Sequence, residues 1–292
     1  MVAPGCRLKL LIVTADDFGA APEVNDAVET AHRRGILTAA SLMVSAPAAA
    51  DAIARARRLP SLRVGLHLVL LEGRPVLPAA AVPHLVNGAG MFSANPAAFG
   101  TRLACSRAAR RELAAEITGQ FAAFRDSGLT LDHCNAHKHF HLHPVVGSLI
   151  AAIGPRFGLR AVRLPLEPAA VLRSVEGRTF SSSAALAQPF ARALRRRLAA
   201  AGLLTTDRVF GVRWSGQLRR ERLAGLIRHL PPGSSEIYLH PATGAYPGSA
   251  RGYAYREELE ALTAPEIIAA CRDLRLRLGG FAQLAPAEAV AA

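Results

Sequence analysis

The stretch LDHCNAHKHFHLHP, from Leu131 to Pro144, decides how the fold of this 292-residue chain is interpreted. It holds five of the ten histidines of the chain: His133, His137, His139, His141 and His143. All five positions are odd-numbered, and side chains alternate between the two faces of a strand. A fully extended chain would therefore place all five histidines on one face and Cys134 on the other. Pro144 suits the first turn of a helix. We therefore expect the early histidines at the end of a strand and the later ones in the turn toward that helix.

Strand-like and helix-like segments alternate on both sides of this stretch. The predicted strands are LKLLIVTA, LTAASLMVS, LRVGLHLVL, LTLDHCNAH, RAVRLP, DRVFGVRW, SEIYLHP and LRLGGFAQL. The predicted helices are VNDAVETAHRRG, PAAADAIARARRL, SRAARRELAAEITGQFAAFRDSG and PVVGSLIAAIGPRFG, with others near residues 183–201, 218–229 and 264–274. This alternation predicts an α/β fold with a parallel sheet.

Polar residues at the strand ends favour a barrel over an open, doubly wound sheet. Asp16, Asp17, His67, the histidine stretch and His240 each fall at or just beyond the C-terminal end of a predicted strand. A (β/α) barrel collects such residues around one mouth, where catalysis in that fold takes place. We expect a TIM-like (β/α) barrel, distorted or with fewer than eight strands, that forms one domain over residues 1–292. Residues 71–107 are predicted to be a loop excursion over the mouth, and residues 165–205 a variable insertion.

The composition excludes several classes of protein. Hydrophobic residues make up 51% and charged residues 20% of the chain, which is typical of a globular protein rather than a disordered one. The net charge of +13 comes almost entirely from arginine and lacks interleaved aromatic residues, so we expect no nucleic-acid partner. No apolar run is long enough for a transmembrane helix. Four widely spaced cysteines without a CxxC pair favour a reduced, cytoplasmic setting.

Two adjacent carboxylates, Asp16 and Asp17, end the first predicted strand. Buried carboxylates are costly unless a cation or strong donors compensate them, although a helix cap for the segment that starts near Pro22 is an equally simple reading. Regular strand geometry points the two side chains to opposite sides, whereas the turn near Gly19 can bring them together. The different directions of the two side chains suggest two roles, one aspartate as a metal ligand and the other as a base.

His67 and His240 are each either hydrogen-bonded core histidines or members of a site. Their positions at strand ends favour the site, His67 as a ligand and His240 as a proton donor. One aspartate and two histidines are a common ligand set for one divalent ion, zinc by ligand preference or magnesium. Such an ion lowers the pKa of bound water from about 16 toward 7, a carboxylate then takes the proton, and a histidine protonates the leaving group. This is the chemistry of amide or ester hydrolysis.

These motifs resemble the YdjC-like carbohydrate deacetylases, which include the chitooligosaccharide deacetylases, and within them the branch associated with hopanoid biosynthesis. The matching stretches, in family order from about residue 7 to residue 245, are LLIVTADDFG with Asn25 downstream, GILTAASLMV, VGLHLVLLEGRPV, AHKHFHLHP and EIYLHPA. The resemblance implies a (β/α)-barrel hydrolase that uses one divalent metal ion to remove an N-acetyl group from an amino sugar.

The resemblance also implies roles for five residues: Asp17, His67 and His137 as metal ligands, Asp16 as general base and His240 as acid. Four more residues are candidates for contacts with substrate or for support of the ligands: Asn135, His139, His141 and Arg163. Several relatives have an aspartate where this chain has Asn135. A neutral amide can orient a ligand or water but cannot serve as a base.

The hopanoid branch implies a lipid-linked substrate, such as an N-acetylglucosaminyl bacteriohopanetetrol. Phe190, Leu194 and Leu198 lie four residues apart on one predicted helical face with arginines around it. This face could rest on the inner membrane surface, but an ordinary barrel helix with a solvated arginine face is the favoured interpretation. Surfaces within residues 71–107 are candidates for pairing two chains as a homodimer.

Two other functions remain open at this point. The first is another metal-dependent barrel hydrolase of the phosphoesterase or amidohydrolase type. Amidohydrolases usually place an HxH pair on the first strand and an aspartate late, which is the reverse of the order found here. The second is a non-catalytic, histidine-rich metal-binding protein, which would bind metal in residues 131–144 independently of Asp17 and His67.

Overall fold

The computed structural model describes residues 9–177 and 184–284 of the chain. Its strands are β1 (Lys9–Phe18), β2 (Ala39–Leu42), β3 (Arg63–Leu68), β4 (Cys134–Ala136), β5 (Arg208–Phe210), β6 (Gly233–Leu239) and β7 (Arg277–Leu278). They form one curled, all-parallel sheet in the order β4-β3-β2-β1-β6-β5, and β7 pairs with the early residues of β1. This half-barrel confirms the predicted α/β fold, a distorted TIM-like barrel with fewer than eight strands.

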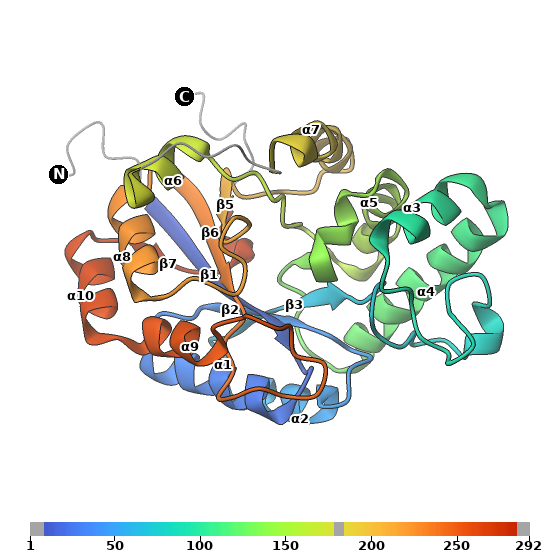
Figure 1. The fold of residues 1–292 in the computed structure, drawn as a ribbon, viewed down its shortest axis with the longest axis horizontal. Helices are drawn as coiled ribbons and strands as arrows, with labels where there is room; N and C mark the ends of the chain where they lie inside the picture. Colours follow the sequence, from blue (N-terminus) through green and yellow to red (C-terminus); the bar gives the residue numbers. More distant parts are fainter. Residues whose placement is uncertain (1–8, 178–183, 285–292) are drawn as a thin grey trace.

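Helices cover the outside of the curled sheet (Figure 1). In the described residues they are α1 (Pro22–Arg34), α2 (Ala49–Arg57), α3 (Pro96–Cys105), α4 (Arg107–Asp126), α5 (Pro144–Ile153), α6 (Ala169–Glu176), α7 (Ala184–Ala200), α8 (Arg220–His229), α9 (Tyr255–Thr263) and α10 (Pro265–Asp273). The helices α3, α6 and α9 were not predicted, and the other seven were. None of the helices within residues 9–177 and 184–284 combines the length and apolarity of a membrane span.

Alternate residues of β1 face the interior of the half-barrel. Ile12 packs there in a small apolar cluster with Phe281, and Thr14 donates a hydrogen bond to Glu236 Oε1 at 2.8 Å. The residues that alternate with these along β1, namely Leu11, Val13 and Ala15, pack in the larger core cluster on the other face of the strand. Both faces of the strand are therefore buried, which explains its continuous apolar run. The interior becomes polar toward the C-terminal end of the strand, where Asp16 is the next inward residue.

The sheet stays open between β4 and β5. RAVRLP, predicted as a strand, makes only isolated bridges there, Val162 with Cys134 and Ala161 with Leu204. The predicted strand is thus reduced to these bridges, because Pro165, the last residue of the segment, lacks the backbone N–H that would continue the ladder. Between the bridges and the proline, Arg163 lies with no exposed surface.

Two predicted segments also differ from the structure in length. The strand LTLDHCNAH is reduced to β4, and the side chain of Asp132 before it accepts hydrogen bonds from the backbone N–H groups of Phe281 and Ala282 at 3.0 and 3.1 Å. Residues 71–95 do lack an α-helix, but α3 occupies most of the remaining excursion. Its start is encoded by Asn95, whose side chain accepts from the second and third backbone N–H groups that follow it.

The helix α7 turns its apolar face inward. Leu194 and Leu198 are 2% and 0% exposed, and Leu194 lies so close to Gly147 of α5 that a Cβ there would meet it at 2.7 Å. Only Phe190, at 51%, is exposed among the three apolar residues of that predicted face. The two leucines of this face are therefore part of the protein interior, as in an ordinary barrel helix, and a membrane contact through the exposed Phe190 stays a prediction.

Candidate active site

An irregularity at the end of β1 brings both aspartates to one cavity. The pairing of β1 with β2 shifts register between Ala15 and Phe18, and Asp17 takes a left-handed backbone conformation with φ 61°. Aspartate adopts this conformation more readily than most residues because its short side chain bonds locally. A bulge of this kind re-aims a side chain. Asp16 and Asp17, which a regular strand would separate, both line a cavity of about 540 Å³.

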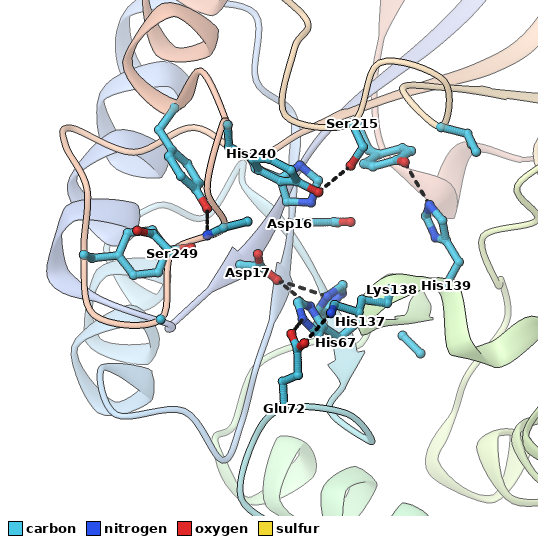
Figure 2. A pocket seen from close by; sticks show the side chains of 18 residues that line it. Asp16, Asp17, His67, Glu72, His137, Lys138, His139, Ser215, His240 and Ser249 are labelled. Atoms are coloured by element: carbon cyan, nitrogen blue, oxygen red, sulfur yellow. Dashed lines mark hydrogen bonds and ion pairs between the residues drawn. The ribbon is translucent and has the colours of Figure 1, made fainter. Parts of the chain in front are cut away.

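Asp17, His67 and His137 converge on one point in this cavity (Figure 2). His137 Nδ1 lies 3.1 Å and His67 Nε2 3.3 Å from the same oxygen, Asp17 Oδ1. One ligand atom from each of the three residues lies within 4.8 Å of the others. His67 Nε2 is buried and makes no hydrogen bond. A carboxylate and two imidazoles with an unpaired buried nitrogen are the donor set that a divalent ion with open positions requires, so the residues fit such an ion.

Asp16 is held by a buried arginine rather than by the triad. Arg163 donates to both oxygens of Asp16, at 2.5 and 2.9 Å, and to Glu236 Oε1 at 2.7 and 2.9 Å. Burial opposes the ionisation of Asp16, but the Arg163 charge outweighs it and holds the pKa of that carboxyl well below its usual range. Asp16 is therefore a charged, rigidly oriented carboxylate beside the triad. Arg163 does not itself line the cavity.

Asn135 stands between His67 and the arginine. The register of β3 and β4 pairs His67 with Asn135, and the amide lies 2.6 Å from His67 Nδ1. With Oδ1 toward His67, the amide accepts the Nδ1 proton, which leaves Nε2 free to bind a metal. The reverse orientation satisfies the neighbouring donors better: Oδ1 accepts from Arg163 at 3.0 and 3.1 Å and from Ser41 at 2.9 Å, and the amide NH2 donates to His67 Nδ1 at 2.6 Å. In either orientation Asn135 makes a hydrogen bond that orients the His67 imidazole, and it does not line the cavity.

The later histidines of the opening stretch divide into two roles. Lys138 and His139 have left-handed φ values of 54° and 52°, so the chain leaves the extended path on which all five histidines would share one face. His139 lines the cavity, and its Nε2 lies 2.8 Å from the Tyr238 hydroxyl. His141 is fully buried and donates from Nε2 to the Arg163 carbonyl at 3.1 Å. Burial and the Arg163 charge lower the pKa of His141 to about 3, so it stays neutral.

His240 follows β6 directly, on the strand next to β1. The parallel register pairs Ala15 of β1 with Leu239 of β6. Asp16 and His240 are the next residues of the two chain segments and therefore lie side by side. The imidazole packs against the ring of Tyr253, with centroids 5.1 Å apart. Burial lowers the pKa of His240, while the charges of the two aspartates oppose that shift. The cavity therefore holds a carboxylate and an imidazole on adjacent strands next to the triad.

Several residues that line the cavity were not predicted. The chain has four tyrosines, and all of them lie here: Tyr238, Tyr246, Tyr253 and Tyr255. Glu72 also lines the cavity and forms an ion pair with Lys138 at 2.5 Å. Of the five non-glycine residues with positive φ in the described ranges, four lie in this cavity: Asp17, Glu72, Lys138 and His139. Such backbone strain concentrates at functional sites.

Glu258 on α9 ties together two walls of the cavity. Its carboxylate accepts from the backbone N–H of His240 at 2.6 Å and from that of Leu218 at 2.8 Å. The backbone N–H of Ala254 donates to the Gly216 carbonyl at 2.7 Å and closes the same junction. The loop after β5 and the tyrosine-bearing loop after β6 are thereby fixed to each other through one buried carboxylate.

Glu258→Gln is expected to remove part of the pH dependence of stability. Burial raises the pKa of Glu258 from 4.5 to about 7, so the folded protein binds an additional proton between these values. The wild-type free energy of unfolding therefore falls as pH rises from about 5 to about 8, by on the order of 2–3 kcal/mol from this residue. Denaturant unfolding of both proteins at the two pH values measures this fall, which the Gln variant lacks. Equal pH slopes in the two proteins would contradict the assignment.

Comparisons with known proteins agree on the fold and the family of this chain. A protein of 24% identity from Enterococcus faecalis V583, described as a proposed cellobiose-phosphate cleavage protein, has a crystal structure that matches the fold with a TM-score of 0.77, over 96% of this chain and 100% of that one. The chain is 31% identical to a carbohydrate deacetylase of Geobacillus stearothermophilus over 91% of this chain and 94% of the relative. It is also 31% identical to a chitooligosaccharide deacetylase of Serratia marcescens, over 94% and 99%.

A human carbohydrate deacetylase is likewise 31% identical, over 88% of this chain and 85% of its own length. The family model described as YdjC-like protein matches residues 10–273, which span β1 to the end of α10 and include every residue of the cavity. The chain therefore belongs to the family of YdjC-like proteins.

Proposed function

We propose that this protein is a metal-dependent hydrolase that removes the N-acetyl group from an amino sugar. The observation that carries the proposal is the convergence of Asp17, His67 and His137 on one point of a cavity that also holds Asp16 and His240. The similarity to carbohydrate and chitooligosaccharide deacetylases supports an amide of an amino sugar as the bond that is broken.

The three converging side chains would hold one divalent ion, with zinc favoured by the two imidazoles. When bound, such an ion supplies Lewis acidity, which polarises the amide carbonyl and acidifies a water molecule. Asp16 accepts the proton of the water that attacks the amide carbon. Arg163 occupies one lone pair on each Asp16 oxygen, and Asn135 lies 3.5 Å from Oδ1, so the second lone pair of Oδ2 is the one available to accept that proton.

His240 donates a proton to the nitrogen of the leaving amine as the C–N bond breaks. The products are acetate and the free amino sugar, so that one water is consumed for each amide. His139, fixed by the Tyr238 hydroxyl, lines the same cavity and offers a contact for the substrate. The tyrosine rings present apolar faces with hydroxyl groups at their edges, which suits a sugar ring with its C–H faces and hydroxyls.

We further propose that the substrate is an N-acetylglucosaminyl glycolipid of hopanoid biosynthesis, reached from the cytoplasmic side of the inner membrane. The resemblance of the sequence motifs to the hopanoid-associated branch supports this assignment. The described cysteines Cys105, Cys134 and Cys271 are free, which suits a reduced compartment. A peripheral membrane contact and a homodimer through residues 71–107 stay predictions. Vesicle co-sedimentation tests the membrane contact, and light scattering tests the dimer.

His240→Ala is expected to lower kcat for acetate release by about 10²–10⁴-fold while the bound metal is retained, because proton donation is lost and the triad is not. The measurement is acetate release from N-acetylglucosaminyl compounds by the metal-loaded protein, with mass spectrometry to detect the loss of one acetyl group. His84→Ala, which changes an exposed histidine remote from the cavity, is the matched control and should leave kcat unchanged. Wild-type protein that binds metal yet releases no acetate from any N-acetylated sugar or glycolipid would refute the proposed function.

A further inference from the structure

A second cavity borders two residues of the triad, Asp17 and His137. Its volume is about 470 Å³, and it shares Asp17, Glu72 and His137 with the cavity described above. Tyr246 and Gly248 border both cavities as well. A molecule whose reacting amide lies at Asp17 can therefore extend in two directions, toward the tyrosines or into this second cavity, which we call the apolar groove.

The apolar groove differs from the tyrosine-lined cavity in its chemistry. Its floor is formed by Val69, Leu71 and Met43, which are 4%, 1% and 7% exposed. Its sides are formed by residues of the loop after β2 and of the 71–95 excursion, among them Ala46 and Met91. The chain has three methionines, and both internal ones, Met43 and Met91, lie here. Flexible thioether side chains adapt to apolar ligands of varied shape.

Charged and polar groups of the groove are confined to a few positions. Apart from Asp17 and His137 of the triad, the polar side chains of the groove are those of Ser45, Glu72, Arg74 and Tyr246. Glu72 is already paired with Lys138. A second sugar ring in the groove would lay its hydroxyls against the apolar floor without partners, which is costly. The methyl of an acetyl group is far smaller than the groove, so neither of these groups accounts for it.

We infer that the apolar groove binds the hydrocarbon aglycone of the substrate, while the N-acetylated sugar occupies the tyrosine-lined cavity. The inference rests on the proposed function, because it takes the reacting amide to lie at the shared triad. It adds the location of the aglycone and the residues that select it, namely Met43, Ala46, Val69, Leu71 and Met91. The groove makes an apolar aglycone a determinant of specificity rather than a passive carrier.

The test compares methyl and octyl N-acetyl-β-glucosaminides, the octyl compound below its critical micelle concentration. Each methylene that is buried raises affinity about fourfold, so burying three of the seven additional methylenes raises kcat/KM about 50-fold. Ala46→Trp fills the partly exposed groove and is expected to bring the octyl compound to parity with the methyl compound, while turnover of the methyl compound persists. Ala80→Trp, at an exposed position outside the groove, is the matched control and keeps the octyl preference. Met91→Ser provides a second groove variant in case Ala46→Trp does not fold.

Equal kcat/KM for the octyl and methyl compounds in the wild type would overturn the inference, as would an octyl preference that survives in both groove variants. N,N′-diacetylchitobiose forms a further arm. If its turnover, rather than that of the octyl compound, falls in the groove variants, the groove is a second sugar subsite and the inference is wrong. Calorimetry of octyl and methyl glucosaminides with the same variants measures how much the groove contributes to binding affinity, independently of catalysis. A groove-dependent octyl preference in binding, with no acetate released from any compound, would uphold the groove and refute the deacetylase.

Discussion

Asp17→Asn is expected to lower acetate release by roughly 10³-fold or more and to leave the purified protein without a stoichiometric divalent ion. Asp17 Oδ1 is the atom on which His67 Nε2 and His137 Nδ1 converge, and it supplies the only negative charge among the three ligand atoms. An amide at this position keeps the shape but not the charge. Asparagine tolerates the left-handed backbone that residue 17 adopts, so the variant should fold. Metal analysis of the purified protein and kcat/KM for an N-acetylglucosaminide measure the two effects.

The same substitution separates the enzyme from a histidine-rich metal-binding protein. If the stretch 131–144 binds metal by itself, the double variant Asp17→Asn, His67→Ala will keep the metal content of the wild type. The structure argues against that outcome, because His133 and His141 are fully buried and His137 faces a carboxylate of another strand. Asp126→Asn, at an exposed position at the end of α4, is the control for loss of one negative charge.

Arg163→Met is expected to lower the free energy of unfolding by about 3–5 kcal/mol and to abolish activity. The substitution leaves Asp16 and Glu236 buried without their cation, since both carboxylates are at most 2% exposed. Urea unfolding of the two proteins gives the change in stability. A loss below about 1 kcal/mol would mean that water reaches the carboxylates and that the arginine is not their main compensation.

A compensated variant distinguishes the two effects of Arg163. The triple change Arg163→Met, Asp16→Asn, Glu236→Gln removes all three charges and is expected to recover most of the lost stability, because no unpaired buried charge remains. It should not recover acetate release, because the carboxylate of Asp16 is also gone. Recovery of activity would exclude Asp16 as the base.

The positions of the site residues along the chain were predictable because of a general property of parallel sheets. The C-terminal ends of parallel strands meet at one edge, so Asp17, His67 and His240, each at such an end, are placed near one another. The details were not predictable from local patterns. The bulge that brings Asp16 and Asp17 into one cavity depends on pairing with β2, and the parity argument for the histidines fails where Lys138 and His139 become left-handed.

Arg163 and the tyrosines show two other limits of local sequence patterns. Arg163 was named as a candidate, but its pairing with Asp16 and Glu236 was not predicted, because that pairing depends on the position of its segment between β4 and β5 in the folded chain. The tyrosines do carry a signal, since all four fall between residues 238 and 255. No periodicity marks them as inward-facing, because they lie on β6, on the following loop and at the start of α9. Their common destination is a property of the folded chain.

The concentration of aromatic residues around one cavity has a spectroscopic consequence. The single tryptophan of the chain, Trp214, is buried directly before Ser215, which lines the cavity together with all four tyrosines. Its ring lies 5.3 Å from the Arg222 guanidinium carbon. Nearly all near-ultraviolet absorption and emission of the polypeptide therefore originates in or next to the cavity. Ligands and metal ions can accordingly be titrated by intrinsic fluorescence, with no introduced label, and the signal reports on this one region of the molecule.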